Sequence, residues 1–214
     1  MVKSTQLALS DAADWLGQWH PLAEQLGSAD GLLTFDTGSA ILEIAPVHDF
    51  ESLRSFLEHY HNRILLSFEL PAIYSAHGHA ERNELRELIA LDQRLVNEPI
   101  LKLFAGASRR IGQAQLQKLR PLRDLRFLQR YLQAVEGNQA HGWHTLVYGV
   151  TLAIYSLPLR QGMLGYAHQV TRGFIYAAAP SLHLSERDCR VIFDTLCKNL
   201  PEAVDALVRQ EAAA

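Results

Sequence analysis

Histidine is the residue type in this 214-residue sequence that most readily suggests metal chemistry, because ten histidines occur and six of them form close pairs. The pairs are His59/His61, His77/His79 and His141/His144. Residues i and i+2 of a helix point about 200° apart, so the first pair cannot chelate one ion from a regular helix.

The other two pairs have better geometry for a shared ion. His77 and His79 flank Gly78 at an expected helix end, where a loop could bring both rings together. His141 and His144 stand at i and i+3, a spacing that places both on one helical face. No carboxylate or thiol accompanies either pair at the spacing of a metal site. We therefore interpret these histidines as surface or partly buried residues and predict no metal ligands.

Motifs for nucleophilic or phosphate chemistry are missing from the sequence. It contains no Gly-x-Ser-x-Gly elbow, no phosphate-binding glycine loop, no His-Glu-x-x-His and no Cys-x-x-Cys. Ser108 and Cys189 lack a nearby base in sequence, and we interpret both as packing residues. Four acidic residues lie in and just before the helix expected from residue 83: Glu81, Glu84, Glu87 and Asp92. We interpret them as one solvated helix face. No catalytic and no cofactor-binding residue is predicted.

The composition is that of a globular protein, with 48% hydrophobic and 20% charged residues. The net charge of −3 indicates no bulk attraction to nucleic acid or to an anionic membrane. Cys189 and Cys197 are the only cysteines, and they stand about 12 Å apart along one expected helix, too far for a disulfide. With no charged-then-apolar leader at the start of the sequence, we expect a reducing, cytoplasmic location.

The elements that must position these residues are organised around two consecutive apolar helices. Arg160 and Arg172 are the only ionised side chains between His144 and Ser185. Apolar residues recur there at three- and four-residue steps, as in helices buried on most faces. Arg172 and its polar neighbours interrupt the second helix, so its apolar stretch is too short and too polar to span a membrane. We interpret both as core helices, and because such surfaces are costly to leave in water we expect a homodimer.

Periodicity and capping residues predict an all-α fold, a single-domain bundle of about eight to ten helices. Residues 1–30 are a loosely specified N-terminal region with a short helix through Trp15 and Trp19, and residues 31–214 form the helical domain. A turn is expected at 36–39. The expected helices are 49–64, 71–78, 83–95, 99–118, 121–137, two within 141–179, 185–199 and one from 201 onward. Their predicted caps are Asp49, Asn83 and a Ser185/Asp188 capping box, and Gly106, Ser108 and Gly112 should let another helix approach closely.

Basic residues gather in one part of the chain. Between residues 99 and 133, eight Lys and Arg residues face a single acid, Asp124, so this stretch carries +7 and the remainder −10. At 100° per residue, Leu125, Leu128, Leu132 and Val135 share one face of the expected helix, opposite Arg123, Arg126 and Arg130. The arginines form either a solvated face or a docking surface for an acidic protein partner. No aromatic residues interleave with them, so nucleic acid is not the predicted partner.

Two alternative functions are compatible with these residues. One is an all-α enzyme of small-molecule metabolism, with Tyr148, Tyr166 and His168 converging in a helical pocket. The other is a His-based metal carrier that uses His77 and His79.

Three stretches, in this order and spacing, resemble the urease accessory protein UreF family. The first runs from Val47 to His77 and contains the acidic-Leu-Pro step Glu69-Leu70-Pro71. The second is 107–116, similar to the family's Ser-x-x-x-Gly, with an apolar residue four positions later. The third is Tyr148-Gly149-Val150, followed by Ser156-Leu157-Pro158-Leu159 and the apolar helix 162–179. Together they cover roughly residues 47–210.

This resemblance implies an all-α, usually dimeric protein without catalytic chemistry of its own. It implies a scaffold, or chaperone, in nickel metallocentre assembly, which binds a UreD/UreH-like accessory protein, a UreG-like GTPase and apo-urease. Nickel would be carried only by the assembly complex, with no permanently bound cofactor. Residues of the last loop and its flanks, together with the arginine face, are the expected partner-binding residues: Tyr176, Ala178, His183, Ser185, Arg187, Arg123, Arg126 and Arg130.

The sequence also departs from the family pattern around that last loop. The basic residue that often precedes the loop falls at Ala178, and the family's paired Gly-Gln steps fall at His183-Leu184 and Arg187-Asp188.

Overall fold

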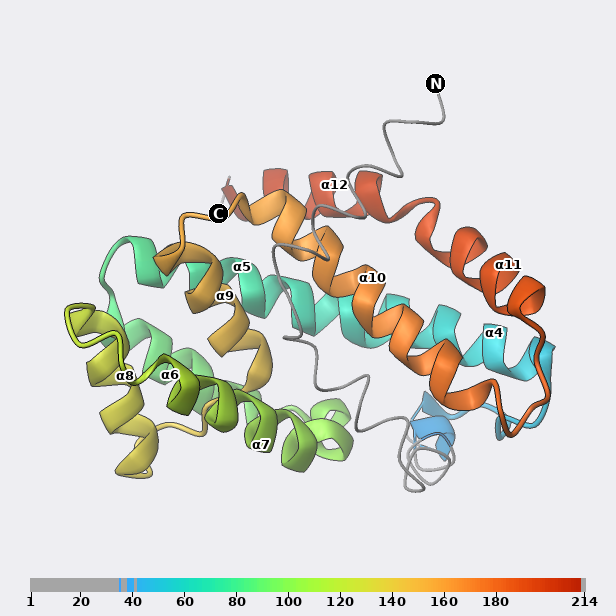
Figure 1. Ribbon diagram of the computed structural model, residues 1–214, viewed down its shortest axis with the longest axis horizontal. Helices are drawn as coiled ribbons and strands as arrows, with labels where there is room; N and C mark the ends of the chain where they lie inside the picture. Colours follow the sequence, from blue (N-terminus) through green and yellow to red (C-terminus); the bar gives the residue numbers. More distant parts are fainter. Residues whose placement is uncertain (1–34, 36–37, 41, 213–214) are drawn as a thin grey trace. The chain divides into compact units, whose positions relative to one another are not determined.

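The computed structural model describes residues 35, 38–40 and 42–212, apart from the side chains of Leu103, Phe104 and Ala212 (Figure 1). The region 1–30, with its expected helix and domain boundary, lies outside these residues. Of the turn expected at 36–39, residues 38 and 39 are described, and both are helical.

All regular structure in the described ranges is helical, which confirms the predicted all-α fold. The α-helices are α4 (Phe50–Tyr60), α5 (Leu70–Glu81), α6 (Leu85–Leu95), α7 (Lys102–Leu119), α8 (Arg126–Glu136), α9 (His144–Ile154), α10 (Leu159–Ala178), α11 (Glu186–Cys197) and α12 (Leu200–Ala212). A π-helix, η1 (His61–Glu69), joins α4 to α5, and a 3₁₀ turn, η2 (Pro99–Leu101), precedes α7. The described residues form two compact units, one that ends at residue 61 and includes 160–206, the other of 62–159 with 207–212.

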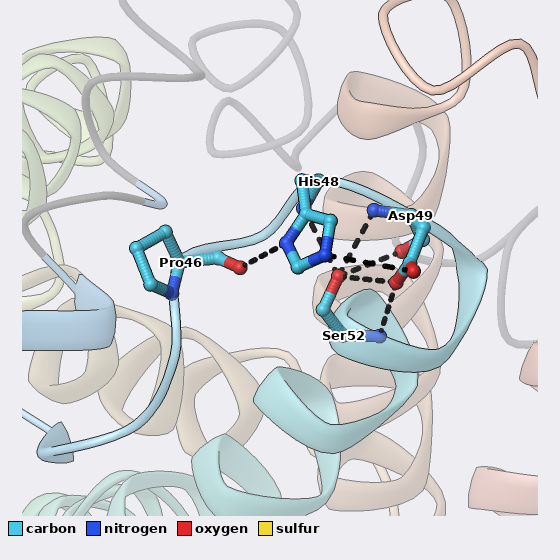
Figure 2. A network of polar contacts seen from close by, with 4 residues as sticks. All are labelled: Pro46, His48, Asp49 and Ser52. Carbon is cyan, nitrogen blue, oxygen red and sulfur yellow. Dashed lines mark hydrogen bonds and ion pairs between the residues drawn. The ribbon is translucent and has the colours of Figure 1, made fainter.

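Helix α4 begins as its capping residue predicts. The Asp49 side chain accepts the Ser52 backbone N–H at 2.8 Å, and the Ser52 hydroxyl accepts the Asp49 N–H at 2.9 Å (Figure 2). The His48 backbone N–H donates to the same hydroxyl. These bonds satisfy donors that would otherwise lack acceptors at a helix start, and the Ser52 hydrogen bonds hold the pKa of Asp49 below its ordinary value.

The helix expected over 49–64 changes type at residue 61, where η1 begins. Pro71, near the start of α5, has no N–H for the carbonyl four residues earlier, and its ring crowds that carbonyl, so regular α-helical bonding cannot continue through this point. The wider π-turns tolerate this proline, and the Ser67 hydroxyl donates to the Asn62 carbonyl at 2.7 Å.

The first unit is built on aromatic packing between α4 and α10. Phe56 and Tyr60 of α4 lie edge-on to Phe174 of α10, with ring centroids 5.7 and 4.7 Å apart. Phe35 completes the cluster, 5.0 Å from Phe56 and 5.5 Å from Phe174. All four rings are at most 2% exposed, so the apolar residues of α10 in this cluster are covered by the chain itself.

The second unit depends on close backbone approach. Gly149 of α9 packs on α5, where an added Cβ would overlap the Ile73 carbonyl oxygen. Gly112 of α7 lies against the 142–144 segment in the same way, and the Ser108 hydroxyl accepts the His144 backbone N–H at 3.1 Å. Ser108 thus caps α9 from another helix. Small residues on α7 do admit a neighbour, as expected, although Gly106 faces open space.

One buried carboxylate joins three segments of this unit. Asp92, on α6, accepts the Tyr131 hydroxyl at 2.8 Å and the His141 and Gly142 backbone N–H groups at 2.5 and 2.9 Å. The Trp143 indole N–H donates to the Asp92 carbonyl at 3.2 Å. Asp92 is 0% exposed, so its assignment to a solvated face is wrong. The alternation of charged residues along α6 hides it, because Leu88, Leu91, Asp92 and Leu95 share the inward face.

Several helix ends use left-handed residues that are not glycine. Asn83, with φ of 58°, ends α5, since the Glu84 N–H bonds to the His79 carbonyl and the Asn83 N–H to the Ala80 carbonyl. Asn83 is therefore not the predicted N-cap of α6, which is Glu84, and α5 continues through Gly78. The same bond pattern occurs at three other positive-φ residues. Asn138 ends α8, Ser156 ends α9, and His183 ends the turn after α10.

Replacement of the buried glycines tests the close helix approach. Gly149→Ala and Gly112→Ala should each lower the free energy of unfolding by about 1–3 kcal/mol, because the added methyl group meets backbone atoms that cannot rotate away. Gly106→Ala, in the same helix as Gly112, is the control and should raise stability by up to about 1 kcal/mol. Urea unfolding measures all three, and equal effects would contradict the packing.

The Asp92 network predicts an asymmetric pair of variants. Asp92→Ala leaves one hydroxyl and two backbone N–H groups without their acceptor and should cost about 3–5 kcal/mol. Tyr131→Phe removes a single donor and should cost about 1–2 kcal/mol. Thermal and urea unfolding would refute the network if Asp92→Ala were the milder change.

Candidate functional site

The segment from the end of α10 to the start of α11 carries most of the expected partner-binding residues. Tyr176 is 56% exposed, and His183, Ser185 and Arg187 are exposed as well. Ala178 is fully buried, so its side chain belongs to the core. The structure therefore brings the other four to one exposed segment of the first unit.

Local backbone bonds hold this segment in a defined shape. After α10, the Leu184 N–H donates to the Ala179 carbonyl at 3.0 Å, with His183 at a φ of 51°. Next, the Ser185 hydroxyl accepts the Asp188 N–H at 3.2 Å, and the Asp188 carboxylate accepts the Ser185 N–H at 3.0 Å. The predicted capping box is confirmed. Hydrogen bonding to Ser185 lowers the pKa of Asp188, which stays ionised at the positive end of α11.

A groove of about 600 Å³ lies between α10 and α11 beside this segment. Its lining residues are Arg172, Ile175, Tyr176, Glu186, Cys189, Arg190, Phe193 and Asp194. Ile175 and Cys189 are buried, and the charged residues stand above them. Arg190 is 3.3 Å from Glu186, and the Arg172 guanidinium lies 5.3 Å from the centre of the Phe193 ring. The groove thus has an apolar base and both signs of charge at its edges.

Neither cysteine of α11 is poised for nucleophilic chemistry. Both are free and buried, as the spacing of the pair predicts. Burial raises the pKa of Cys189, and it raises that of Cys197 to about 12. Both are thiols at neutral pH, whereas nucleophiles and metal ligands are thiolates.

A buried polar cluster lies in the first unit, where α4 meets α10. Thr171 donates to the Ala167 carbonyl at 2.7 Å, so its oxygen accepts from His61 Nε2, also at 2.7 Å. Burial, followed by the proximity of His168, lowers the pKa of His61 to about 4. Burial and then Arg172 lower the pKa of His168 equally, to about 4. Both rings are neutral at pH 7 and serve packing rather than proton transfer.

The histidine pairs are not brought together. His77 and His79 both lie inside α5, so the loop expected at Gly78 is wrong, and they pair separately with Glu81 at 3.4 Å and Glu84 at 2.9 Å. His144 begins α9 and is fully buried, whereas His141 precedes the helix. The shared helical face expected for that pair is therefore wrong. Within the described ranges no group of three or more His, Cys, Asp or Glu residues is arranged to hold a metal ion.

The residues expected to line a helical pocket are Tyr148, Tyr166 and His168. Tyr148 and Tyr166 are 4% and 0% exposed and belong to different compact units. His168 packs on Phe193, with ring centroids 5.7 Å apart, and none of the three lines the groove described above.

Arg123, Arg126 and Arg130 are all exposed, as expected. Helix α8 begins at Arg126 rather than near Pro121, so Arg123 lies in the preceding turn. Leu128, Leu132 and Val135 are buried on the opposite face, which confirms the amphipathic pattern of the helix.

Sequence reasoning missed most of the groove. Its α11 members, Glu186, Cys189, Arg190, Phe193 and Asp194, recur at i, i+3, i+4, i+7 and i+8, the spacing of one helical face. Three of these five residues are charged, so the face does not have the apolar pattern of a buried helix surface. The matching α10 residues share it by tertiary packing, which the sequence does not reveal.

Comparison with models of protein families gives a match that covers more than half of the chain. A family model described as UreF matches residues 47–192, from before α4 into α11. No curated protein matches the chain. No helix in the described ranges has both the length and the apolar character needed to span a membrane.

The buried His61 predicts a pH-dependent stability. Its folded-state pKa is about 4, whereas an unfolded histidine has a pKa near 6.5. The unfolded chain therefore takes up the proton first, and stability that is complete above pH 6.5 is lost as the pH falls towards 4. Between pH 7 and 5, the wild type should lose about 1–2 kcal/mol more than His61→Gln, which keeps a donor for Thr171. Urea unfolding at each pH measures this difference, and parallel curves would contradict it.

Proposed function

This chain belongs to the UreF family, and on that basis we propose that it is a urease accessory protein acting as a non-catalytic scaffold in nickel metallocentre assembly. In this role it bridges a UreD/UreH-like accessory protein and a UreG-like GTPase on the way to apo-urease, in the cytoplasm. Nickel is the cargo of that complex and not a resident cofactor of this chain.

The observation that carries the proposal is the family match, which extends over residues 47–192 and thus over helices of both compact units. The chemistry of the described residues is compatible with it. The buried histidines of the first unit are neutral and the two cysteines are protonated at pH 7. What the chain offers to other molecules is exposed surface.

The partner surface proposed here comprises Tyr176, His183, Ser185 and Arg187, with the groove between α10 and α11 beside them. An exposed tyrosine at the edge of a partly apolar groove is typical of a protein interface, because its ring supplies contact area at a low entropic cost. The preformed loop supports the same proposal, since little ordering is needed on binding.

The departure at His183 leaves the loop backbone compatible with the family pattern. That pattern has glycine at this position, and His183 has a φ of 51°, a conformation that glycine adopts without strain. The substitution therefore changes the side chain presented to a partner more than the course of the chain.

The proposal includes a homodimer, and family membership is the observation that supports it. Helix α9 is buried against α5 and α7 of its own chain, and Phe174 of α10 is buried against α4. Exposed apolar surface on these helices is no longer an argument for a second copy.

Two exposed tyrosines provide a matched test. Tyr176→Asp should reduce co-purification of the full chain with the co-expressed accessory protein and GTPase at least tenfold, because a buried charge would replace an interface ring. Tyr155→Asp, at a 50% exposed tyrosine of the second unit, should stay within about twofold of wild type. A wild-type chain that binds neither protein, or equal losses in both variants, would overturn the proposal.

A further inference from the structure

The second unit carries a basic surface that its own fold leaves without counter-charges. Arg126 and Arg130 stand one turn apart on the exposed face of α8, and Arg123 stands in the turn before it. No salt bridge within the described part of the chain includes any of the three. We call these three residues the α8 basic surface.

Two acidic residues on α8 and on its neighbour α6 are committed to other groups. Asp92 lies beneath the helix and accepts the hydroxyl of Tyr131 and two backbone N–H groups. Glu136, at the other end of α8, binds the Arg120 guanidinium and the Gln117 amide. Neither carboxylate is free to neutralise the arginines outside. Asp124 is the remaining acid of this stretch, and it leaves the surface positive.

The positions of these arginines are unfavourable for α8 itself. The start of a helix carries partial positive charge. Arg126 is the first residue of α8, whose first turn contains no acidic residue and whose N-cap residue, Leu125, makes no side-chain capping bond. Arg126 and Arg130 also repel each other at i and i+4. In the same chain, α4 and α11 begin with capping boxes and acidic first turns. Helices α5, α7 and α9, like α8, begin with neither feature, and Arg126 and Arg130 add two like charges to one exposed face of α8.

The turn that carries Arg123 is held in place. The Gln129 side-chain amide donates to the Arg120 and Leu122 carbonyls, both at 3.1 Å, and the Arg123 N–H donates to the Pro121 carbonyl at 2.8 Å. The backbone positions of the three arginines are therefore held relative to one another, with Arg126 and Arg130 about 5–6 Å apart at Cβ. Carboxylates on successive turns of a helix, or on an extended strand, match that spacing.

We propose that the α8 basic surface binds an acidic segment of a partner protein. The charge complementarity is with carboxylates rather than with a nucleic acid, because Tyr131 is fully buried and Phe127 mostly so, which leaves no aromatic face for a base. A chain with a net charge of −3 also lacks the general positive field of a nucleic-acid-binding protein. This inference does not depend on the urease role, since any partner with an acidic segment would satisfy it.

The test uses the full chain and a fluorescein-labelled poly-L-glutamate peptide of about 20 residues, followed by fluorescence anisotropy at low ionic strength. Wild type should bind, and binding should disappear near 0.5 M salt, where exposed charges are screened. Arg126→Gln/Arg130→Gln should weaken binding at least fivefold. Lys198→Gln/Arg209→Gln removes the same charge from two exposed residues elsewhere and should stay within about twofold.

Thermal unfolding separates loss of binding from loss of fold. The Arg126→Gln/Arg130→Gln variant should melt at or slightly above the wild-type temperature, because it removes a repulsion from the start of α8. A lower melting temperature would contradict the electrostatic argument. Equal weakening in the control variant would show that bulk charge alone attracts the peptide. Tighter binding to duplex DNA or to anionic phosphatidylserine vesicles than to polyglutamate, or no binding to polyglutamate, would also overturn the proposal.

Discussion

A single buried carboxylate sets much of the geometry of the second unit. Asp92 of α6 receives donors from α8 and from the segment that leads into α9, and this segment in turn lies against Gly112 and Ser108 of α7. The backbone N–H groups that donate to Asp92 lie in the stretch before α9. The N-cap residue of α9, Trp143, makes no side-chain capping bond. A buried donor without an acceptor is costly, so these contacts have few alternatives. The position of α9 on α5 through Gly149 follows from the same arrangement.

The first unit follows a different principle. Aromatic rings from α4 and α10 form its core, and the buried His61 and Thr171 side chains hydrogen-bond to each other. Burial keeps His61 and His168 neutral and the two thiols protonated at pH 7. What remains accessible is the α10–α11 segment and its groove, where Tyr176 stands next to charges of both signs. A surface of this kind is suited to holding another protein.

This division fits a member of the UreF family, whose role is accessory to urease. The two surfaces singled out differ in their chemistry and belong to different units: the first is partly apolar with a preformed loop, and the second is purely cationic. Partners that differ in charge could therefore be distinguished by one chain, since electrostatic complementarity contributes more to selectivity than to affinity.

Local chemistry was enough to predict much of this protein from its sequence. The helical periods, the Asp49 and Ser185 caps, the amphipathic face of α8 and the UreF resemblance all depend on residues close together in the chain. Two of the wrong predictions show what competes with such local signals. Asp92 has the spacing of a surface residue, but it is buried and accepts hydrogen bonds from residues about 40 to 50 positions away in the chain. Asn83 has the chemistry of an N-cap, yet the last carbonyls of α5 required a left-handed residue there. The groove depends on which faces of α10 and α11 meet, because packing, and not spacing, decides which side chains become neighbours.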